Sequence, residues 1–494
     1  MNYFLTSYFN ETPSAIEIAD IRRLRLFDQI GEPATIVTES PIWDSGYVLD
    51  QLGIRQRVVN MYRYYQQLER YDGPETTTTS IRSTLPDLPF KNNAILDDGK
   101  PVVKIHEEHG QLSYVDYLDL FGFTNRRDFY ESGVHSYSEF YDDHAKLQLK
   151  QYYNYQGKPV ITCYYHGGPS NQAILTMLHL VTSNQIYQFQ SLDAFRAHFL
   201  DDLTQNDDTL ICDREDYWGM TMGLMHKNPR RMLMIHAAFT TNAKRDGEVF
   251  TSIKNTIEHG KLDTVITSTQ AEADDIHARF PEVPTEVIPV SAVPDKRLDT
   301  NFPFEIRIPF QIIAVARVTE IKQLSHAINA VIKLHGHFPE VDFKIYGYED
   351  LLNGYAESKK LRKIINQNNA AGYIHFMGYM KDLSPVYQKA DLLLLTSRSE
   401  GFSMAILEAL SYACPVVSYD INYGPNELVK PGENGQLVPA NDEYTLFRTL
   451  VDIFKDRQQL QRFGLFAQNS VREFGESAIK KRWEKALNTA RREV

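Results

Sequence analysis

The pattern of apolar and polar positions predicts alternating strands and helices at the start of the chain. A short apolar run over residues 3–7 is typical of a buried strand, and apolar positions at helical spacing over residues 14–27 predict a helix capped near Ser14. A second buried strand is expected over residues 34–38, and a helix over residues 48–68. This alternation indicates an α/β fold with a parallel sheet.

The pattern changes at about residue 76. Threonines at 76–79 with Pro86 and Pro89 interrupt the helical spacing, and short alternating segments separated by turn residues follow. These segments predict an antiparallel meander with strands over residues 102–107, 112–118, 126–131, 136–141, 147–153 and 160–165. They are rich in Tyr and Phe, which suits either ordinary sheet packing or one face that contacts a partner.

The α/β pattern returns after about residue 190. Strands are expected first over residues 209–212, 231–235, 264–267 and 286–288, and, after a Pro-bearing stretch over 289–309, over 311–316, 342–346, 374–377, 392–396 and 415–419. The meander therefore interrupts one α/β domain, and a second one follows. In a protein with two doubly wound halves, the expected ligand site is a cleft at the carboxyl ends of the strands.

Composition narrows the class of protein. The chain has 494 residues and an ordinary globular composition. Its net charge of −12 argues against a nucleic-acid partner, because phosphate groups bind to basic surfaces. Its three cysteines are far apart in the sequence, which fits a reducing compartment rather than a disulfide framework. The sequence shows neither a secretory leader nor an apolar run of the about 20 residues that cross a bilayer. We therefore expect a cytoplasmic protein, with at most peripheral contact at the inner face of the cell membrane.

The segment 399–409 carries the most informative candidate chemistry. It follows an expected apolar strand and opens a helix, so Gly401 lets the backbone approach a ligand closely. The backbone N–H groups that could hold a phosphate at this helix start belong to Phe402, Ser403 and Met404. Glu400 and Glu408 would then meet other groups of the ligand. The alternative is that Glu400 only caps the helix and Glu408 is solvated.

Two further elements end predicted strands. Arg317 follows the strand over 311–316, with Lys322 shortly after it, and two cations at such a position can neutralise a diphosphate. A surface ion pair with Glu320 is the alternative interpretation. His236 follows the strand over 231–235, although a single histidine in this position is more often structural.

Together these residues resemble the retaining nucleotide-sugar glycosyltransferases of the GT-B fold, family 4. The resemblance rests on Arg317 and Lys322, on the EX7E pattern from Glu400 to Glu408, on His236, and on the glycines Gly347 and Gly378. The segments 423–427 and 433–435, with the inserted meander, are similar to bacterial enzymes that glycosylate serine-rich or Ser-Asp repeat surface proteins and wall teichoic acid.

The resemblance implies a two-domain α/β architecture. It consists of two Rossmann-like doubly wound domains with an antiparallel β-meander inserted in the first. The expected boundaries are 1–84 with 191–303 for the N-terminal acceptor domain, 85–190 for the insert, 304–478 for the nucleotide-sugar domain and 479–494 for a C-terminal helix that packs back on the N-terminal domain.

The resemblance also implies roles for individual residues. A UDP-sugar is the expected co-substrate, with neither a cofactor nor a metal. Catalysis is expected to involve Arg317, Lys322, Glu400 and His236. Donor binding is expected at Glu408, Gly401, Phe402, Ser403, Met404, Gly347, Gly378, Tyr379, Ser14 and Ala15. Such enzymes commonly have glycine in the first loop, where this chain has Ala15.

The expected reaction moves N-acetylglucosamine or glucose to Ser/Thr hydroxyls of a bacterial surface protein. Transfer to wall teichoic acid, a polyol-phosphate polymer, is an alternative, and so is a non-catalytic partner that binds the acceptor. An epimerase or a glycogen-type phosphorylase could share the shape, but no lysine can be assigned to the pyridoxal phosphate that the latter needs. We expect a homo-oligomer, or a complex with a paralogous subunit, through the insert.

Overall fold

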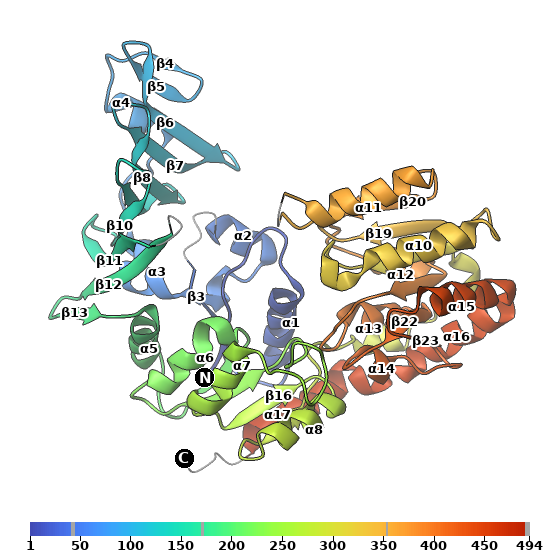
Figure 1. Ribbon diagram of the computed structural model, residues 1–494. Helices are drawn as coiled ribbons and strands as arrows, with labels where there is room; N and C mark the ends of the chain where they lie inside the picture. Colours follow the sequence, from blue (N-terminus) through green and yellow to red (C-terminus); the bar gives the residue numbers. More distant parts are fainter. Residues whose placement is uncertain (41–44, 169–171, 352–353, 490–494) are drawn as a thin grey trace. The chain divides into compact units, whose positions relative to one another are not determined.

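The computed structural model describes residues 1–40, 45–168, 172–351 and 354–489 (Figure 1). The chain forms two compact units. Unit 1 comprises Met1–Leu24, Glu32–Arg231 and Glu258–Lys261, and unit 2 comprises Arg25–Gly31, Met232–Ile257 and Leu262–Val494. Part of the predicted C-terminal segment, residues 490–494, lies outside the described residues. The domain boundaries expected from the sequence stay predictions.

Unit 1 contains a parallel sheet built from the N-terminal strands. Its order is β14-β1-β2-β3, with β1 Asn2–Leu5, β2 Ala34–Thr38, β3 Val58–Asn60 and β14 Thr209–Cys212. The helices of unit 1 are α1 Ala15–Gln29, which continues into unit 2, α2 Ser45–Leu52, α3 Met61–Gln66, α4 Thr78–Ser83, α5 Leu192–Leu203 and α6 Glu215–Leu224. The single helix predicted over 48–68 is wrong, because the β-branched residues Val58 and Val59 pair with Ile36 and Val37 of β2.

The second sheet of unit 1 is antiparallel, as the meander pattern predicted. It has ten strands in sequence order, visible in blue to green in Figure 1. They are β4 Phe90–Lys91, β5 Ala94–Asp97, β6 Lys100–Glu108, β7 Gln111–Leu118, β8 Thr124–Glu131, β9 Val134–Tyr141, β10 Leu147–Tyr153, β11 Pro159–Gly167, β12 Ala173–Val181 and β13 Ile186–Phe189. The six predicted strands are confirmed, whereas β4, β5, β12 and β13 were missed.

The aromatic residues of this sheet stack on one another across the strands. Ring centroids of Tyr114 and Phe129 lie 5.7 Å apart, those of Phe129 and Tyr137 4.3 Å, and those of Tyr137 and Tyr152 5.2 Å. Tyr152 then stacks at 4.2 Å on Tyr62 of α3 and is only 2% exposed. Aromatic pairs at these distances stabilise a sheet, so this row of side chains serves packing within unit 1.

Unit 2 contains parallel strands throughout. One set has the order β17-β16-β15 and the other forms a six-stranded sheet with the order β20-β19-β18-β21-β22-β23. The strands are β15 Arg230–Met234, whose first two residues belong to unit 1, β16 Thr264–Thr267, β17 Thr285–Val287, β18 Gln311–Val315, β19 Asp342–Tyr346, β20 Ile374–Gly378, β21 Leu392–Leu395, β22 Val416–Asp420 and β23 Gly435–Pro439. The helices are α7 Thr251–His259, α8 Gln270–Arg279, α9 Asp295–Leu298, α10 Leu324–His335, α11 Ala356–Gln367, α12 Ser384–Lys389, α13 Met404–Ser411, α14 Pro425–Leu428, α15 Glu443–Lys455, α16 Arg457–Ser470 and α17 Glu476–Asn488.

Hydrophobic residues cover both faces of the six-stranded sheet. Along β21, Leu392 and Leu394 belong to one buried cluster with α10 and α15, while Leu393 and Leu395 belong to another with α13. Such double coverage explains the run of four leucines, because a parallel strand with helices on both faces has no polar side. The predicted doubly wound arrangement is confirmed for this sheet. In α17, Trp483 packs edge-on against Phe27 with ring centroids 5.2 Å apart.

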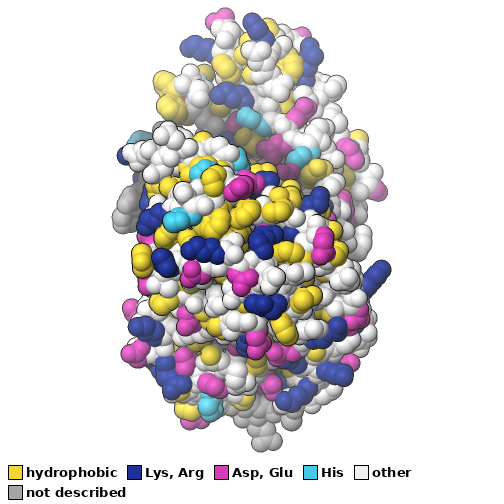
Figure 2. All heavy atoms as spheres, turned by 90° about the vertical axis from the view of Figure 1, so that its right-hand side faces the viewer, with side chains coloured by type: hydrophobic (Ala, Val, Ile, Leu, Met, Phe, Trp, Pro, Cys, Tyr) yellow, Lys and Arg dark blue, Asp and Glu magenta, His cyan; other side chains and the backbone are white. Residues whose placement is uncertain are grey.

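The surface carries charges of both signs. On the face shown in Figure 2, Lys and Arg side chains are interspersed with Asp and Glu side chains. Within the described part of the chain, no helix is long and apolar enough to span a bilayer.

Candidate active site

The carboxyl ends of three strands meet closely in unit 2. Ala316 follows β18 and donates its N–H to the Tyr346 carbonyl at 2.9 Å, and Gly347 after β19 donates to the Gly378 carbonyl at 2.9 Å. Gly347 has φ +144°, and a Cβ there would lie 2.0 Å from the Ala316 oxygen. Only glycine permits this approach, so the backbone forms a tight edge beside Arg317.

Arg317 and Tyr379 flank this edge on exposed positions. The Arg317 side chain is exposed, and within the described residues its guanidinium has neither a hydrogen bond nor an ion pair. Tyr379, directly after Gly378, is 37% exposed. Partial burial and the neighbouring Tyr348 raise the pKa of the Tyr379 phenol, so it stays neutral and can donate a hydrogen bond. An uncommitted guanidinium at a strand end suits an anionic ligand.

Lys322 and Glu400 form an ion pair next to this edge. The Lys322 Nζ lies 2.7 Å from Glu400 Oε1, with the side chains 18% and 13% exposed respectively. Ser397 donates its hydroxyl to the same carboxylate oxygen at 2.6 Å. Thr396, just after β21, donates its hydroxyl to the carbonyls of Lys322 and Gln323 at 3.2 and 3.0 Å. The end of β21 thus holds both charged residues in place.

These contacts answer the alternatives considered for the two motifs. Glu400 forms the ion pair with Lys322, and α13 begins at Met404 without a side-chain cap. Glu320 pairs with Arg398 at 3.4 Å, so it is not the partner of Lys322. The interpretation of Lys322 as one half of a surface pair with Glu320 is therefore wrong.

The loop that opens α13 packs tightly on the segment after β15. A Cβ on Gly401 would lie 2.5 Å from the His236 oxygen, 2.8 Å from its carbonyl carbon and 3.0 Å from the Cα of Ala237. His236 is half-buried and Ala237 is exposed. Gly401 is therefore required for this contact, which brings His236 beside the Glu400 loop within unit 2.

The start of α13 has backbone N–H groups directed away from the helix. Its first backbone hydrogen bond runs from Ile406 to the Ser403 carbonyl at 3.1 Å, which leaves the N–H groups of Ser403 and Met404 outside the helical pattern. Ser403 has φ +70°, and the Phe402 side chain is buried against Phe474 with ring centroids 5.5 Å apart. Phe402 could therefore serve a ligand through its backbone only. Glu408, half-buried, lies inside α13.

Ser14 and Ala15 lie in unit 1 at the start of α1. Ser14 donates its N–H to Glu17 Oε2 at 2.8 Å, and its hydroxyl accepts the Ile16 N–H at 3.3 Å. Arg214 pairs with Glu17 at 2.6 Å and also contacts the Ser14 hydroxyl. The predicted helix cap is confirmed, and the polar groups of Ser14 are engaged in it. The Ala15 side chain is exposed.

Glu272, at the third position of α8, supports the His236 segment and was missed in the sequence. Its Oε1 accepts the Phe239 N–H at 3.1 Å, and its side chain is fully buried. The signal was Thr269-x-x-Glu272, which reads as an ordinary capping box. Nearby, Tyr423 donates to Asp275 at 3.1 Å, and Arg245 pairs with Asp275 at 2.7 Å. These contacts fix the backbone from which His236 projects.

Burial holds the pKa of Glu272 well above its ordinary value of 4.5, with the nearby Asp275 carboxylate adding to the shift and the Phe239 N–H opposing it. Above pH 4.5 the unfolded chain releases this proton while the folded chain keeps it, so stability falls with rising pH until the folded pKa is reached. In this range each pH unit lowers the free energy of unfolding by about 1.4 kcal/mol. We predict that Glu272→Gln, which stays neutral, gains stability over the parent as pH rises.

Urea unfolding at several pH values between 5 and 8 measures this difference. Glu282→Gln, on an exposed residue, is the matched control and is expected to follow the parent at every pH. Parallel curves for the parent and Glu272→Gln would contradict a neutral buried carboxyl at this position.

The described residues do not gather a metal site. Among them, no group of three or more His, Cys, Asp or Glu side chains is arranged to hold a metal ion. All three cysteines are buried and free.

Comparison with known proteins is consistent with this geometry. Residues 301–470 match the family "Glycosyl transferases group 1". A peptide N-acetylglucosaminyltransferase GtfA subunit that uses UDP-N-acetylglucosamine, from Streptococcus gordonii, is 23% identical over 87% of this chain and 86% of its own. A poly(ribitol-phosphate) alpha-N-acetylglucosaminyltransferase from Staphylococcus aureus is 22% identical over 88% of this chain and 87% of its own.

A solved structure has the same fold. A point mutant of TarM from S. aureus, crystallised with Fondaparinux, alpha-GlcNAc-glycerol and UDP, covers 99% of both chains with a TM-score of 0.84 and 18% identity. This match confirms the predicted GT-B architecture, with parallel sheets and an antiparallel insert.

Proposed function

We propose that this chain, whose residues 301–470 form a glycosyl transferases group 1 domain, is a retaining glycosyltransferase that uses a UDP-sugar. It would move N-acetylglucosamine or glucose to Ser/Thr hydroxyls of a bacterial surface protein. The observation that carries this proposal is the Lys322–Glu400 pair, 2.7 Å apart beside a strand edge closed by Gly347. The pair places a cation that could bind a diphosphate next to a carboxylate that could accept hydrogen bonds from sugar hydroxyls. The S. gordonii relative supports the choice of sugar and acceptor.

The proposed reaction first requires that the negative charge on the departing UDP be stabilised. Arg317 and Lys322 would stabilise the negative charge that grows on the diphosphate, because fixed cations act most strongly where charge develops in the transition state. The backbone N–H groups of Phe402, Ser403 and Met404 would contact the same group at the start of α13. The uridine would lie along the strand edge that contains Gly347, Gly378 and Tyr379.

The sugar and the ribose would be held by the remaining residues. Glu408 would accept hydrogen bonds from the ribose hydroxyls and Glu400 from the sugar hydroxyls, with His236 near the 6-hydroxyl. Ser14 and Ala15 are proposed to face the donor phosphate or the acceptor. The acceptor oxygen would bond to the anomeric carbon on the face from which the phosphate oxygen departs, and its proton would pass to that phosphate oxygen. Configuration is then retained, and UDP is released.

Neither a metal nor a cofactor has a role in this proposal. We predict that a chelator leaves the initial rate within about twofold of the untreated enzyme, because Arg317 and Lys322 supply the positive charge that a metal would otherwise bring. UDP release with and without EDTA measures this. Loss of activity that manganese restores would instead indicate a metal-dependent transferase.

Transfer to a polyol-phosphate polymer is the second candidate. It is supported by the S. aureus poly(ribitol-phosphate) relative, which aligns with 88% of this chain, and by the TM-score of 0.84 to TarM. The donor side of the site would be the same, and only the acceptor would differ. A non-catalytic partner that binds the acceptor is disfavoured, since Arg317, Lys322, Glu400 and Glu408 are all present.

The test offers donors and acceptors in parallel to the purified chain. UDP-N-acetylglucosamine, UDP-glucose and UDP-galactose are each incubated with a Ser-rich peptide and with poly(ribitol phosphate), and products are identified by mass spectrometry. Transfer of one N-acetylglucosamine or glucose residue to the peptide supports the main proposal, and transfer only to the polymer supports the second. If no combination of donor and acceptor releases UDP above the rate of a Lys322→Ala variant, the chain is not this enzyme.

We also propose that the protein works with a second subunit in the cytoplasm, with at most peripheral contact at the inner face of the membrane. The S. gordonii relative is named a subunit, which supports an assembly. The antiparallel sheet ends in the short strands β4 and β13, which expose edges that a homo-oligomer or a paralogous chain could use. Three free buried cysteines fit a reducing compartment.

A further inference from the structure

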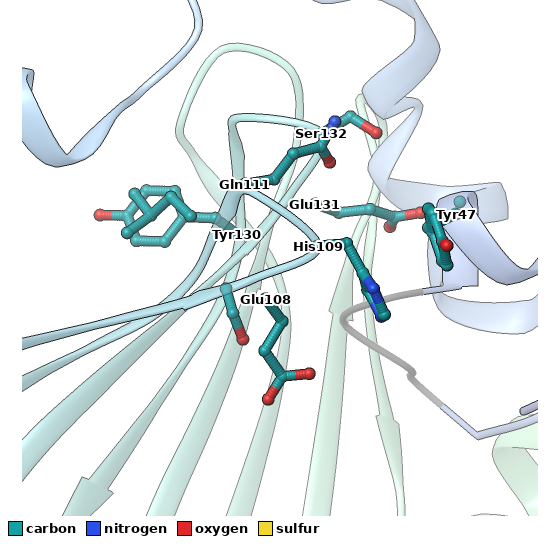
Figure 3. A pocket seen from close by; sticks show the side chains of 10 residues that line it. Tyr47, Glu108, His109, Gln111, Tyr130, Glu131 and Ser132 are labelled. Carbon is teal, nitrogen blue, oxygen red and sulfur yellow. The ribbon is translucent and has the colours of Figure 1, made fainter. Parts of the chain in front are cut away.

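The pocket of unit 1 shown in Figure 3 is too small for an organic ligand. It lies beside the stacked rings of Tyr47 and His109 and has a volume of about 20 Å³, which holds about one water molecule. Glu131 on its wall already pairs with Arg63 at 2.9 Å. A buried hydroxyl with a more specific arrangement lies in unit 2, just after β21.

This hydroxyl belongs to Ser397, which is buried beside the carboxylate of Glu400. Ser397 lies two positions after the last residue of β21, and only 1% of its surface is exposed. Its hydroxyl donates to Glu400 Oε1 at 2.6 Å, a distance typical of a strong hydrogen bond to an ionised acceptor. Lys322 Nζ lies 2.7 Å from the same oxygen. Two donors therefore hold one oxygen of this carboxylate.

The second oxygen of the Glu400 carboxylate is left for a ligand. A carboxylate oxygen offers about two lone-pair sites, and Ser397 and Lys322 occupy those of Oε1. Among the described residues, none donates a hydrogen bond to Oε2, and the Glu400 side chain is 13% exposed. Oε2 is therefore the oxygen that can accept a hydrogen bond from a hydroxyl of a bound sugar.

The backbone of Glu400 is fixed on both sides. Tyr423 donates its N–H to the Glu400 carbonyl at 2.8 Å, and Gly401 packs against the His236 carbonyl. The remaining freedom lies in the rotamers of the Glu400 side chain, and ordering a glutamate side chain is entropically unfavourable. The contacts to Oε1 order this side chain before a ligand binds.

Ser397 and Lys322 would respond differently to a bound donor. Lys322 is 18% exposed and is proposed to bind the diphosphate, so its ammonium group would be shared between Glu400 and the phosphate. Ser397 is almost completely enclosed, so its hydroxyl is out of reach of the ligand and would stay with Glu400 Oε1. Ser397 is thus the contact that keeps the carboxylate in place while the donor is bound.

We propose that Ser397 is a positioning residue for the transferred sugar. Resting on the proposed function, it holds Glu400 Oε1 so that Oε2 accepts hydrogen bonds from the sugar hydroxyls of the UDP-sugar. Misplacement of such a group by about 1 Å can lower a rate about 100-fold. Because Lys322 still restrains the carboxylate in Ser397→Ala, we expect a smaller loss, about tenfold in kcat/KM for the donor.

Binding to the full chain gives the first test. In Ser397→Ala, calorimetry should show that UDP-N-acetylglucosamine or UDP-glucose, whichever the parent uses, binds at least about threefold more weakly. The Kd of UDP should stay constant, because UDP lacks the sugar that Glu400 contacts. Ser418→Ala is the matched control, since Ser418 is also fully buried in unit 2 and its hydroxyl donates to the Tyr419 carbonyl at 3.0 Å. This control should bind both ligands as the parent does.

A double-mutant cycle separates positioning from a general loss of stability. If Ser397 acts through Glu400, Ser397→Ala should have no further effect on the Kd of the UDP-sugar or on kcat/KM in a Glu400→Ala background. An equal loss in both backgrounds overturns the proposal, as do weaker binding of UDP itself and parent-like kinetics of Ser397→Ala. If the parent turns over no donor, the proposed function fails. UDP-sugar binding that still depends jointly on Ser397 and Glu400 would then leave the positioning role standing.

Discussion

Replacing Lys322 with alanine is expected to lower kcat by about 100- to 1000-fold with the fold intact. The variant removes a cation proposed to act on charge that develops on the departing UDP, and loss of one such group typically costs about 3–4 kcal/mol in the transition state. It also leaves the Glu400 carboxylate, 13% exposed, without the partner that lies 2.7 Å away. Because the effect arises in the transition state, kcat should fall far more than KM rises.

Steady-state UDP release, with KM determined separately, measures this prediction. Lys363→Ala is the matched control, since this exposed lysine lies on α11 in the same unit. Arg317→Ala should show a comparable loss, with the exposed Arg448→Ala as its control. Parent-like kcat in Lys322→Ala with an unchanged melting temperature would remove Lys322 from the catalytic set.

Replacing Gly401 with alanine is expected to damage both stability and activity. The new Cβ would lie 2.5 Å from the His236 oxygen and 3.0 Å from the Cα of Ala237, and both are backbone atoms that cannot move aside as a flexible side chain can. Overpacking of this kind costs about 1–3 kcal/mol. The loop that carries Glu400 must also shift away from His236, so we expect activity to fall by at least about 100-fold.

Gly372→Ala provides the control for this variant. A Cβ at Gly372 meets no atom within 4 Å, and its φ lies outside the left-handed region, so this variant should be neutral or stabilised by up to about 1 kcal/mol. Thermal unfolding and UDP release of both variants, side by side, test the comparison. Equal melting temperatures and rates would show that the functional enzyme does not need Gly401 to contact the His236 segment.

The sequence predicted elements well where short apolar runs lie between turn residues. Strands β2 and β19 were expected with the bounds that the structure has, because each is a short apolar-rich run whose burial the sequence pattern shows, nearly complete in β2 and alternating in β19. The strand β23, Gly435–Pro439, was missed because its glycine and proline read as a loop, yet it pairs in parallel with β22 along its whole length. Pairing with a buried neighbour outweighed local propensity there.

In the candidate site, too, the sequence predicted some features and the tertiary structure decided others. Residue type and strand-end position were enough to select Arg317, Lys322 and Glu400, because charge and loop placement are local properties of the sequence. The partner of Lys322 was not predictable, since Glu400 lies 78 positions away and only the pairing of β18 with β21 brings the two together. The nearer Glu320 was the reasonable local choice, and it pairs elsewhere.

Glu272 marks the limit of local reasoning most clearly. Its spacing from Thr269 predicts a helix cap, and Thr269 does accept the Glu272 N–H at 3.3 Å. The carboxyl, however, accepts the N–H of Phe239, 33 positions earlier in the chain, and burial there raises its pKa. The sequence by itself determined the α/β class, the antiparallel insert and the charged residues at strand ends, because periodicity and residue type are local. Only the tertiary structure decided the ion-pair partners, the raised pKa of Glu272 and the Gly401–His236 contact. These features depend on which segments, distant in the sequence, pack together and exclude water.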